Sequence, residues 1–170
     1  MTESDDRKSD EGLDRETAEL VESIHSKLEQ MDLFTLLDID LNADADRVRR
    51  GYFTRSRTFH PDRYYTRNLG AHKKMLERIF AWTTAAYDFL KDDKRRKAYR
   101  KLILTHRDRS SGARVVAVEG EHGLVFRIVD EKAFYGEGAE EAPEAIEGAP
   151  QVKLPQKRYA LPKLKPDGDR

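Results

Sequence analysis

The stretch Phe59-His60-Pro61-Asp62-Arg63 lies between two segments whose apolar residues recur at helical spacing. The first segment, about 45–59, follows Asp44, a residue type that is preferred at helix N-caps. Proline disfavours helical geometry in the residue before it, so this helix is predicted to end at His60. The second segment, about 70–91, carries apolar side chains over more than half of its circumference, which is typical of a helix packed from two sides. The quoted stretch is therefore predicted to be the turn between two antiparallel helices.

Three further helices are predicted around this pair. Residues 13–30 carry one apolar stripe beside several glutamates, which indicates an amphipathic helix with one buried side. Residues 33–39 are long enough for two helical turns, and residues 94–104 are predicted to form a short, very basic helix. Together with the central pair, these segments predict a mainly α-helical fold.

The remaining segments carry weaker structural signals. Residues 105–134 are expected to form a linker with a small β-hairpin, because 114–118 and 124–129 are β-prone runs. An isolated hairpin is only marginally stable, so this one must dock on other elements or form transiently. Residues 1–12 are predicted to be a disordered acidic arm, and residues 135–170 a disordered tail rich in proline, glycine and charged residues.

The charges are segregated along a chain of 170 residues whose net charge is zero. Residues 1–30 hold 10 acidic and 4 basic residues, residues 31–110 hold 11 and 19, and residues 111–170 hold 11 and 9. The basic middle segment points to an anionic partner, either a nucleic acid or an acidic protein surface.

The composition excludes several kinds of site. Without cysteine the chain has no disulfide, no thiolate nucleophile and no cysteine-based zinc site. Its histidines lack metal-ligand spacing and no glycine-rich phosphate loop stands out, so neither a metal nor a cofactor is expected. No apolar run approaches the length of a membrane span, so we expect a soluble, cytoplasmic protein that does not bind a membrane.

The turn and its flanking helices resemble the J-domain of DnaJ-type co-chaperones in order and spacing. The matching positions are Asp32-Leu33-Phe34-Thr35-Leu36-Leu37-Asp38-Ile39, Val48-Arg49-Arg50-Gly51-Tyr52, Phe59-His60-Pro61-Asp62-Arg63, Phe80, Ala86-Tyr87-Asp88-Phe89-Leu90-Lys91-Asp92 and Lys94-Arg95-Arg96-Lys97-Ala98-Tyr99. The resemblance covers about residues 31–101 and implies a four-helix J-domain over 31–104, preceded here by an extra helix. A Gly/Phe-rich linker and a zinc module are missing, which implies a divergent member that shares only the J-domain.

The resemblance also implies a function without chemistry of its own, so this protein is expected not to be an enzyme. J-domains present the His-Pro-Asp loop to the ATPase domain of DnaK-type (heat-shock 70 family) chaperones and trigger ATP hydrolysis by that partner. Divergent members usually recruit the chaperone to one place or client. The sequence leaves the client, the chaperone paralogue and the oligomeric state open.

Eight residues are predicted to bind this partner. They are His60, Pro61, Asp62, Arg63, Arg49, Arg50, Tyr52 and Arg57. Because Pro61 fixes its own φ, His60 and Asp62 are expected to project from a defined turn. The Asp62 carboxylate is suited to pair with an arginine of the partner, and the His60 ring nitrogens to hydrogen-bond within the loop or to the partner.

The other predicted contacts lie on the helix before the turn. Arg49, Arg50 and Arg57 are expected on its outer face, where they would steer the protein to an acidic surface. The match of positions to the family adds Tyr52 and Arg63. Tyr52 also lies on the apolar stripe of the helix, which favours a place in the core over a direct contact.

Some positions depart from the family pattern. Arg55 stands where J-domains usually place a leucine, and it is expected either to extend its guanidinium to solvent or to pair with an acid such as Asp88. Phe53 and Thr54 replace frequent basic residues, which raises the alternative of a regulatory protein that binds the chaperone but stimulates it poorly. Asp38 replaces a usual glycine.

The helix over 70–91 is more apolar than the family pattern requires. Thr83 replaces a usual apolar residue, whereas Ile79 and Trp82 add apolar surface on another side. We expect the amphipathic helix to cover this surface, with the hairpin as the second candidate.

A nucleic-acid-binding module is the alternative from a different functional class. Its phosphate contacts would come from Arg95, Arg96, Lys97, Arg100 and Lys101 on the last helix. The sequence disfavours this function, because it leaves the His-Pro-Asp tripeptide unexplained. We also expect the acidic segment 1–30 to fold back over the arginines of the helix before the turn, so that its deletion raises chaperone stimulation at low salt.

Overall fold

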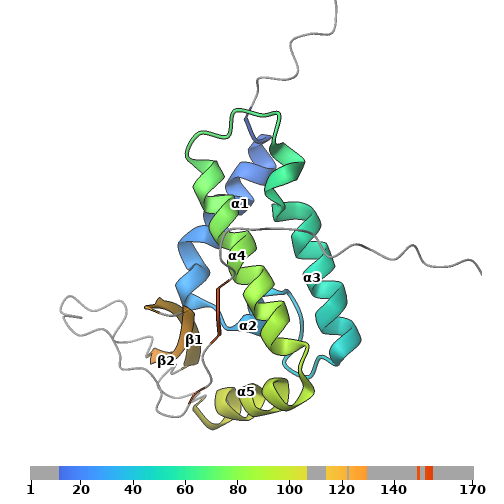
Figure 1. The fold of residues 1–170 in the computed structure, drawn as a ribbon. Coiled ribbons are helices and arrows are strands. Elements are labelled where there is room, and N and C mark those ends of the chain that lie inside the picture. The colour runs from blue at the N-terminus through green and yellow to red at the C-terminus, as the bar shows by residue number, and fades with distance from the viewer. Residues whose placement is uncertain (1–11, 107–113, 122, 130–148, 150–151, 155–170) are drawn as a thin grey trace, which may run out of the picture.

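The computed structural model describes residues 12–106, 114–121, 123–129, 149 and 152–154 (Figure 1). Its elements are α1 (Arg15–Lys27), the 3-10 helix η1 (Leu28–Gln30), α2 (Leu33–Leu36), α3 (Ala45–Phe59), the 3-10 helix η2 (Pro61–Tyr64), α4 (His72–Leu90), α5 (Asp93–His106), β1 (Arg114–Gly120) and β2 (Gly123–Val129). The mainly helical fold with an antiparallel hairpin confirms the predicted fold class. Within the described ranges, no helix has the length and apolar character needed to cross a membrane.

Helices α3 and α4 lie side by side as an antiparallel pair, and the loop between them forms one end of the molecule (Figure 1). α3 begins where the Asp44 carboxylate accepts a hydrogen bond from the Arg47 N–H at 2.8 Å, and it has the predicted bounds. Tyr52 of α3 stacks on Tyr87 of α4, with 4.3 Å between the ring centroids. We call the loop end, residues 60–71, the tip, and the opposite end, formed by α2, α5 and the hairpin, the base.

The base is organised around the buried side chain of Tyr99 on α5. Its hydroxyl accepts a hydrogen bond from the Leu33 N–H of α2 at 3.1 Å. Its ring contacts the rings of Phe34, Phe89 and Phe126, so that α2, α4, α5 and β2 share one aromatic cluster. Burial raises the pKa of the Tyr99 phenol well above its usual range.

Helix α2 has one turn, whereas the sequence predicted two over residues 33–39. The chain leaves the helix at Asp38, whose φ of 58° lies in the left-handed region, and the Ile39 N–H donates to the Phe34 carbonyl at 3.1 Å. The connection then packs directly on α3 at Gly51. A Cβ at Gly51 would lie 2.6 Å from Ile39 Cγ2, so a glycine is needed there.

Helix α1 packs along α4, as expected from the extra apolar surface of α4, and the hairpin packs mainly on η1 and α5. Arg78 of α4 joins η1 to the hairpin, because its guanidinium bonds Glu29 of η1 at 2.5 Å and Glu119 of β1 at 3.0 Å. The same guanidinium lies 5.6 Å from the centre of the Trp82 ring, which is buried. The hairpin is therefore docked on the helices.

The predicted disordered tail over 135–170 is wrong at Val152. The Leu124 N–H of β2 donates to the Val152 carbonyl at 2.6 Å, and the Val152 N–H donates to the Leu124 carbonyl at 3.0 Å. The Val152 side chain is buried. Gly123 has a φ of 136°, and because it lacks a side chain, the backbone of Val152 can approach it closely. The apolar side chain of Val152 and the glycine beside it thus allow this residue to pack against β2. Most of the predicted arm and tail lies outside the described residues.

Candidate partner-docking site

The tip is built on a short, hydrogen-bonded turn. The His60 N–H donates to the Ser56 carbonyl at 2.9 Å and closes α3. Pro61 then occupies the first position of η2, where its missing N–H leaves no donor unsatisfied. The Asp62 N–H donates to His60 Nδ1 at 3.2 Å, and the Arg63 N–H donates to the His60 carbonyl at 3.1 Å. These bonds fix the direction in which each side chain of the turn points.

His60 points into the molecule, so the expectation that it projects from the turn is wrong. His60 is 5% exposed, and its ring packs edge-on against the ring of Phe80 of α4, with 4.7 Å between the ring centroids. Nδ1 accepts from the turn, while Nε2 is buried and has no hydrogen-bond partner among the described residues. The ring therefore joins the turn to α4, and this position is suited to holding Asp62 in place.

Asp62 points away from the molecule. Its side chain is 83% exposed, and its carboxylate lies 3.8 Å from His60 Nδ1. Arg63 lies back along α3, because its Nη1 donates to the Arg57 carbonyl at 3.1 Å and its guanidinium lies over the Tyr64 ring. The turn thus presents one free carboxylate beside cationic side chains.

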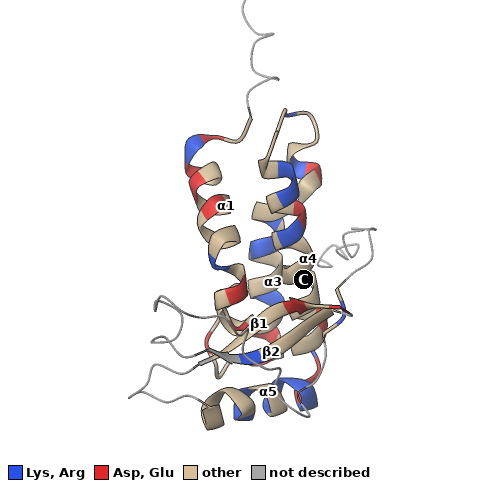
Figure 2. Ribbon diagram, turned by 90° about the vertical axis from the view of Figure 1, so that its left-hand side faces the viewer, with Lys and Arg blue, Asp and Glu red and all other residues tan. Residues whose placement is uncertain are grey.

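The three predicted arginines of α3 are exposed, as expected for an outer basic face. Arg49, Arg50 and Arg57 all lie on the surface, and the Arg49 guanidinium is 5.5 Å from the centre of the Phe53 ring. Figure 2 shows basic segments along α3 and α4 and acidic segments on α1. A positive surface therefore leads from the middle of α3 towards the exposed carboxylate at the tip.

Comparison with known proteins agrees with this geometry. Residues 32–106 match the family described as "DnaJ domain". The chain contains a J-domain. A putative J domain-containing protein of Acanthamoeba polyphaga mimivirus is 33% identical over 85 residues, which are 47% of this chain and 22% of the viral protein. The similarity thus spans about a fifth of that relative, and the matched region differs from the predicted boundaries 31–104 by one residue at its start and two at its end.

Tyr52 belongs to the core of the J-domain. It is 3% exposed and its ring stacks on Tyr87, so its side chain faces α4 and not the outer surface of α3. A direct partner contact would require this stack to open. The apolar stripe therefore located Tyr52 correctly, whereas the family match alone suggested a contact.

Two departures from the J-domain pattern contact each other. Arg55 Nη2 lies 3.8 Å from Asp38 Oδ2, whereas the expected partner, Asp88, bonds Lys91 at 2.7 Å. The Arg55 guanidinium also lies 6.0 Å from the centre of the Phe59 ring. Arg55 Nε is buried without a hydrogen-bond partner in the described part of the chain. An arginine at a usual leucine position thus pairs with an aspartate at a usual glycine position.

Two adjacent tyrosines of the tip differ sharply in exposure, which sequence reasoning missed. Tyr64 is buried and its hydroxyl donates to the Thr58 carbonyl at 2.8 Å, whereas Tyr65 is 83% exposed. Burial raises the pKa of the Tyr64 phenol. The two tyrosines lie between the predicted helices, and two neighbouring identical residues offer no periodicity that would tell them apart.

Helix α1 begins beside the tip of the J-domain. Arg67 Nη1 donates to the Gly12 carbonyl at 3.4 Å, and His72 Nε2 lies 2.8 Å from Glu22 Oε1. Gly12, the first described residue, therefore lies beside the tip. α1 also buries Val21 in the core, so it is an integral part of the fold.

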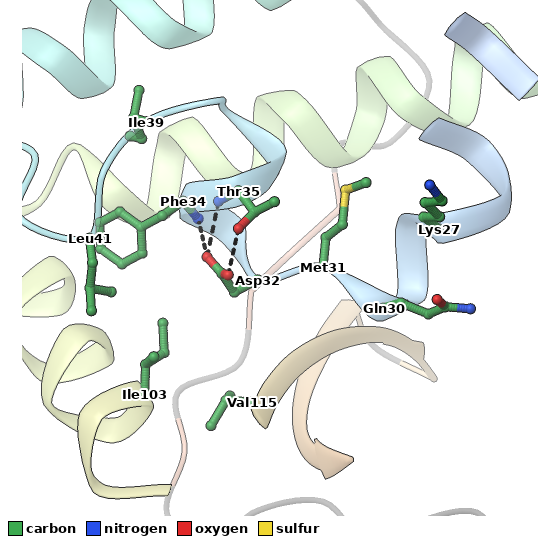
Figure 3. A pocket seen from close by; sticks show the side chains of 10 residues that line it. All are labelled: Lys27, Gln30, Met31, Asp32, Phe34, Thr35, Ile39, Leu41, Ile103 and Val115. Carbon is green, nitrogen blue, oxygen red and sulfur yellow. Dashed lines mark hydrogen bonds between the residues drawn. The ribbon is translucent and has the colours of Figure 1, made fainter. Parts of the chain in front are cut away.

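A pocket of about 450 Å³ lies at the base of the molecule (Figure 3). It is lined by Lys27, Gln30, Met31, Asp32, Phe34, Thr35, Ile39, Leu41, Ile103 and Val115. Its one carboxylate, that of Asp32, accepts hydrogen bonds from the Phe34 and Thr35 N–H groups and caps α2. The pocket is thus mainly apolar, and its acid is already used for structure. Across the described ranges, no group of three or more His, Asp or Glu side chains is arranged to hold a metal ion.

Proposed function

We propose that this protein docks through its tip and the basic face of α3 on the ATPase domain of a DnaK-type chaperone and stimulates ATP hydrolysis by that chaperone. The supporting observation is the Asp62 carboxylate, which is 83% exposed on a turn fixed by Pro61 and His60. A carboxylate held in one direction is suited to a charge-assisted, bidentate pair with an arginine of the partner. In this proposal the protein itself performs no chemistry and recruits the chaperone to one client or place.

The basic face supports the same docking direction. Arg49, Arg50 and Arg57 extend from the middle of α3 to its end at the tip, and all three are exposed. Such a face accelerates encounter with an acidic surface more than it adds affinity. Binding is therefore expected to slow as salt rises, whereas the Asp62 pair accounts for stimulation once the proteins are bound.

Single-turnover ATP hydrolysis by a DnaK-type chaperone of known competence tests the proposal. The wild-type protein is expected to accelerate hydrolysis, and Asp62→Asn is expected to abolish the acceleration because a neutral amide cannot form the ion pair. The exposed Asp62 side chain has no structural partner within 3.5 Å in the described ranges, so circular dichroism and urea unfolding should show the same fold and stability for both proteins. Acceleration by Asp62→Asn equal to wild type would contradict the proposed role.

Two other outcomes point to the alternatives. Binding of the wild-type protein without acceleration would favour the poorly stimulating regulator, in which Phe53 and Thr54 replace frequent basic residues. A nucleic-acid-binding module would instead show salt-dependent binding through α5, where Lys94, Arg95, Lys97, Arg100 and Lys101 are exposed. Arg96 would not contribute, because it is buried and donates to the Leu90 carbonyl at 2.9 Å. The cytoplasmic location stays a prediction.

A further inference from the structure

Tyr65 is the most exposed large hydrophobic residue in the described part of the chain. Tyr65 is 83% exposed, compared with 53% for Leu104 on α5 and 39% for Leu20 on α1. Its side chain forms no hydrogen bond, ion pair or ring contact with the rest of the described chain. The neighbouring Tyr64, in contrast, is 3% exposed. Folding therefore uses one tyrosine of the pair and leaves the other in solvent.

The backbone that carries Tyr65 is anchored on both sides. Tyr64 holds the preceding residue through its bond to the Thr58 carbonyl, and Leu69 is buried a few residues later. The Tyr65 N–H donates to the Asp62 carbonyl at 3.4 Å, which ties it to the same turn as the exposed carboxylate. A tyrosine has only two side-chain torsions to restrain, so it loses little entropy when a partner covers it.

We propose that Tyr65 is an aromatic anchor of the docking surface and inserts into an apolar recess of the chaperone next to the group that pairs with Asp62. The inference rests on the proposed function and adds a residue to the surface that it uses. Tyrosine is enriched among the few residues that carry most of the binding energy at interfaces, and such residues lie near the centre of the contact. The ring supplies apolar area beside a charged pair, and its removal is expected to weaken binding rather than the trigger itself.

The test compares Tyr65→Ala, Tyr65→Phe and Leu104→Ala in the full chain, with Asp62→Asn in parallel. The readout is the dependence of single-turnover ATP hydrolysis on protein concentration, which separates half-saturation from maximal acceleration. Tyr65→Ala is expected to raise the half-saturating concentration about tenfold, with the maximum retained. Tyr65→Phe is expected to stay near wild type because it keeps the ring. Leu104→Ala is the matched control, since it removes an exposed apolar side chain from the opposite end of the molecule.

Each other outcome has a distinct meaning. Wild-type half-saturation by Tyr65→Ala, while Asp62→Asn abolishes acceleration, would overturn the anchor and leave the proposed function intact. An equal loss in Tyr65→Ala and Leu104→Ala would also overturn it, because the effect would not be specific to the tip. No acceleration by the wild-type protein would contradict the proposed function itself, and the anchor with it. Thermal unfolding of the variants checks that the exposed substitutions leave the fold unchanged.

Discussion

The base and the tip of the molecule differ in whether their polar groups are buried or exposed to solvent. At the base, the Tyr99 hydroxyl is buried and accepts the Leu33 N–H, so a polar atom joins two helices inside an aromatic cluster. At the tip, the Asp62 carboxylate and the Tyr65 ring both lie in solvent, on a turn whose own bonds use His60 and Tyr64. Substitutions at the base should therefore lower the stability of the fold, whereas substitutions at the tip should affect the interaction with the proposed chaperone partner.

The largest effect is expected from Tyr99→Ala at the base. Removing the ring opens a cavity among aromatic side chains and leaves the Leu33 N–H without its acceptor, so the free energy of unfolding should fall by about 3–5 kcal/mol. Urea unfolding measures this change, and Tyr65→Ala, which removes a solvent-exposed ring, should change it by less than about 0.5 kcal/mol. Equal losses in the two variants would remove the distinction between base and tip.

A smaller effect is expected from Arg55→Leu, on the side of α3 that faces Asp38. The substitution removes an Nε that is buried without a partner and restores an apolar side chain, so stability should rise by about 1 kcal/mol. The loss of the pair with Asp38 offsets little of this gain, because the Asp38 side chain is 82% exposed. Chemical unfolding checks the gain, and ATP hydrolysis should be unaffected. A loss of stability would mean that the ion pair and the contact of the guanidinium with the Phe59 ring outweigh the cost of the unpaired nitrogen.

The smallest effect concerns the arm of residues 1–11, which carries five acidic and two basic residues. It is attached at Gly12 beside the tip, so its removal should raise chaperone stimulation at low salt, by less than about twofold, and have no effect near physiological salt. The cut has to end before α1: the deletion of residues 1–30 considered from the sequence would remove Val21, Ile24 and Leu28 from the core. Unchanged stimulation at low salt would exclude screening by the arm.

Local patterns predicted the helices well, and long-range contacts explain what they missed. The bounds of α3 follow from its cap at Asp44 and the proline after His60, both of which act within a few residues. The inward direction of His60 depends on Phe80, which lies on another helix. The pairing of Arg55 with Asp38 likewise depends on where α2 ends, which the local pattern did not predict. The burial of Val152 depends on its pairing with the edge of β2, a strand that is distant in the sequence.

The bridge between Leu124 and Val152 changes the topology of the C-terminal region. The bridge joins two residues that lie 28 positions apart in the sequence, so its formation carries the entropic cost of closing the intervening chain into a loop. The entropy of closing such a loop grows only with the logarithm of its length, and a doubling costs about 0.6 kcal/mol. A moderate change in the number of residues between Val129 and Val152 should therefore alter the stability of this bridge only slightly.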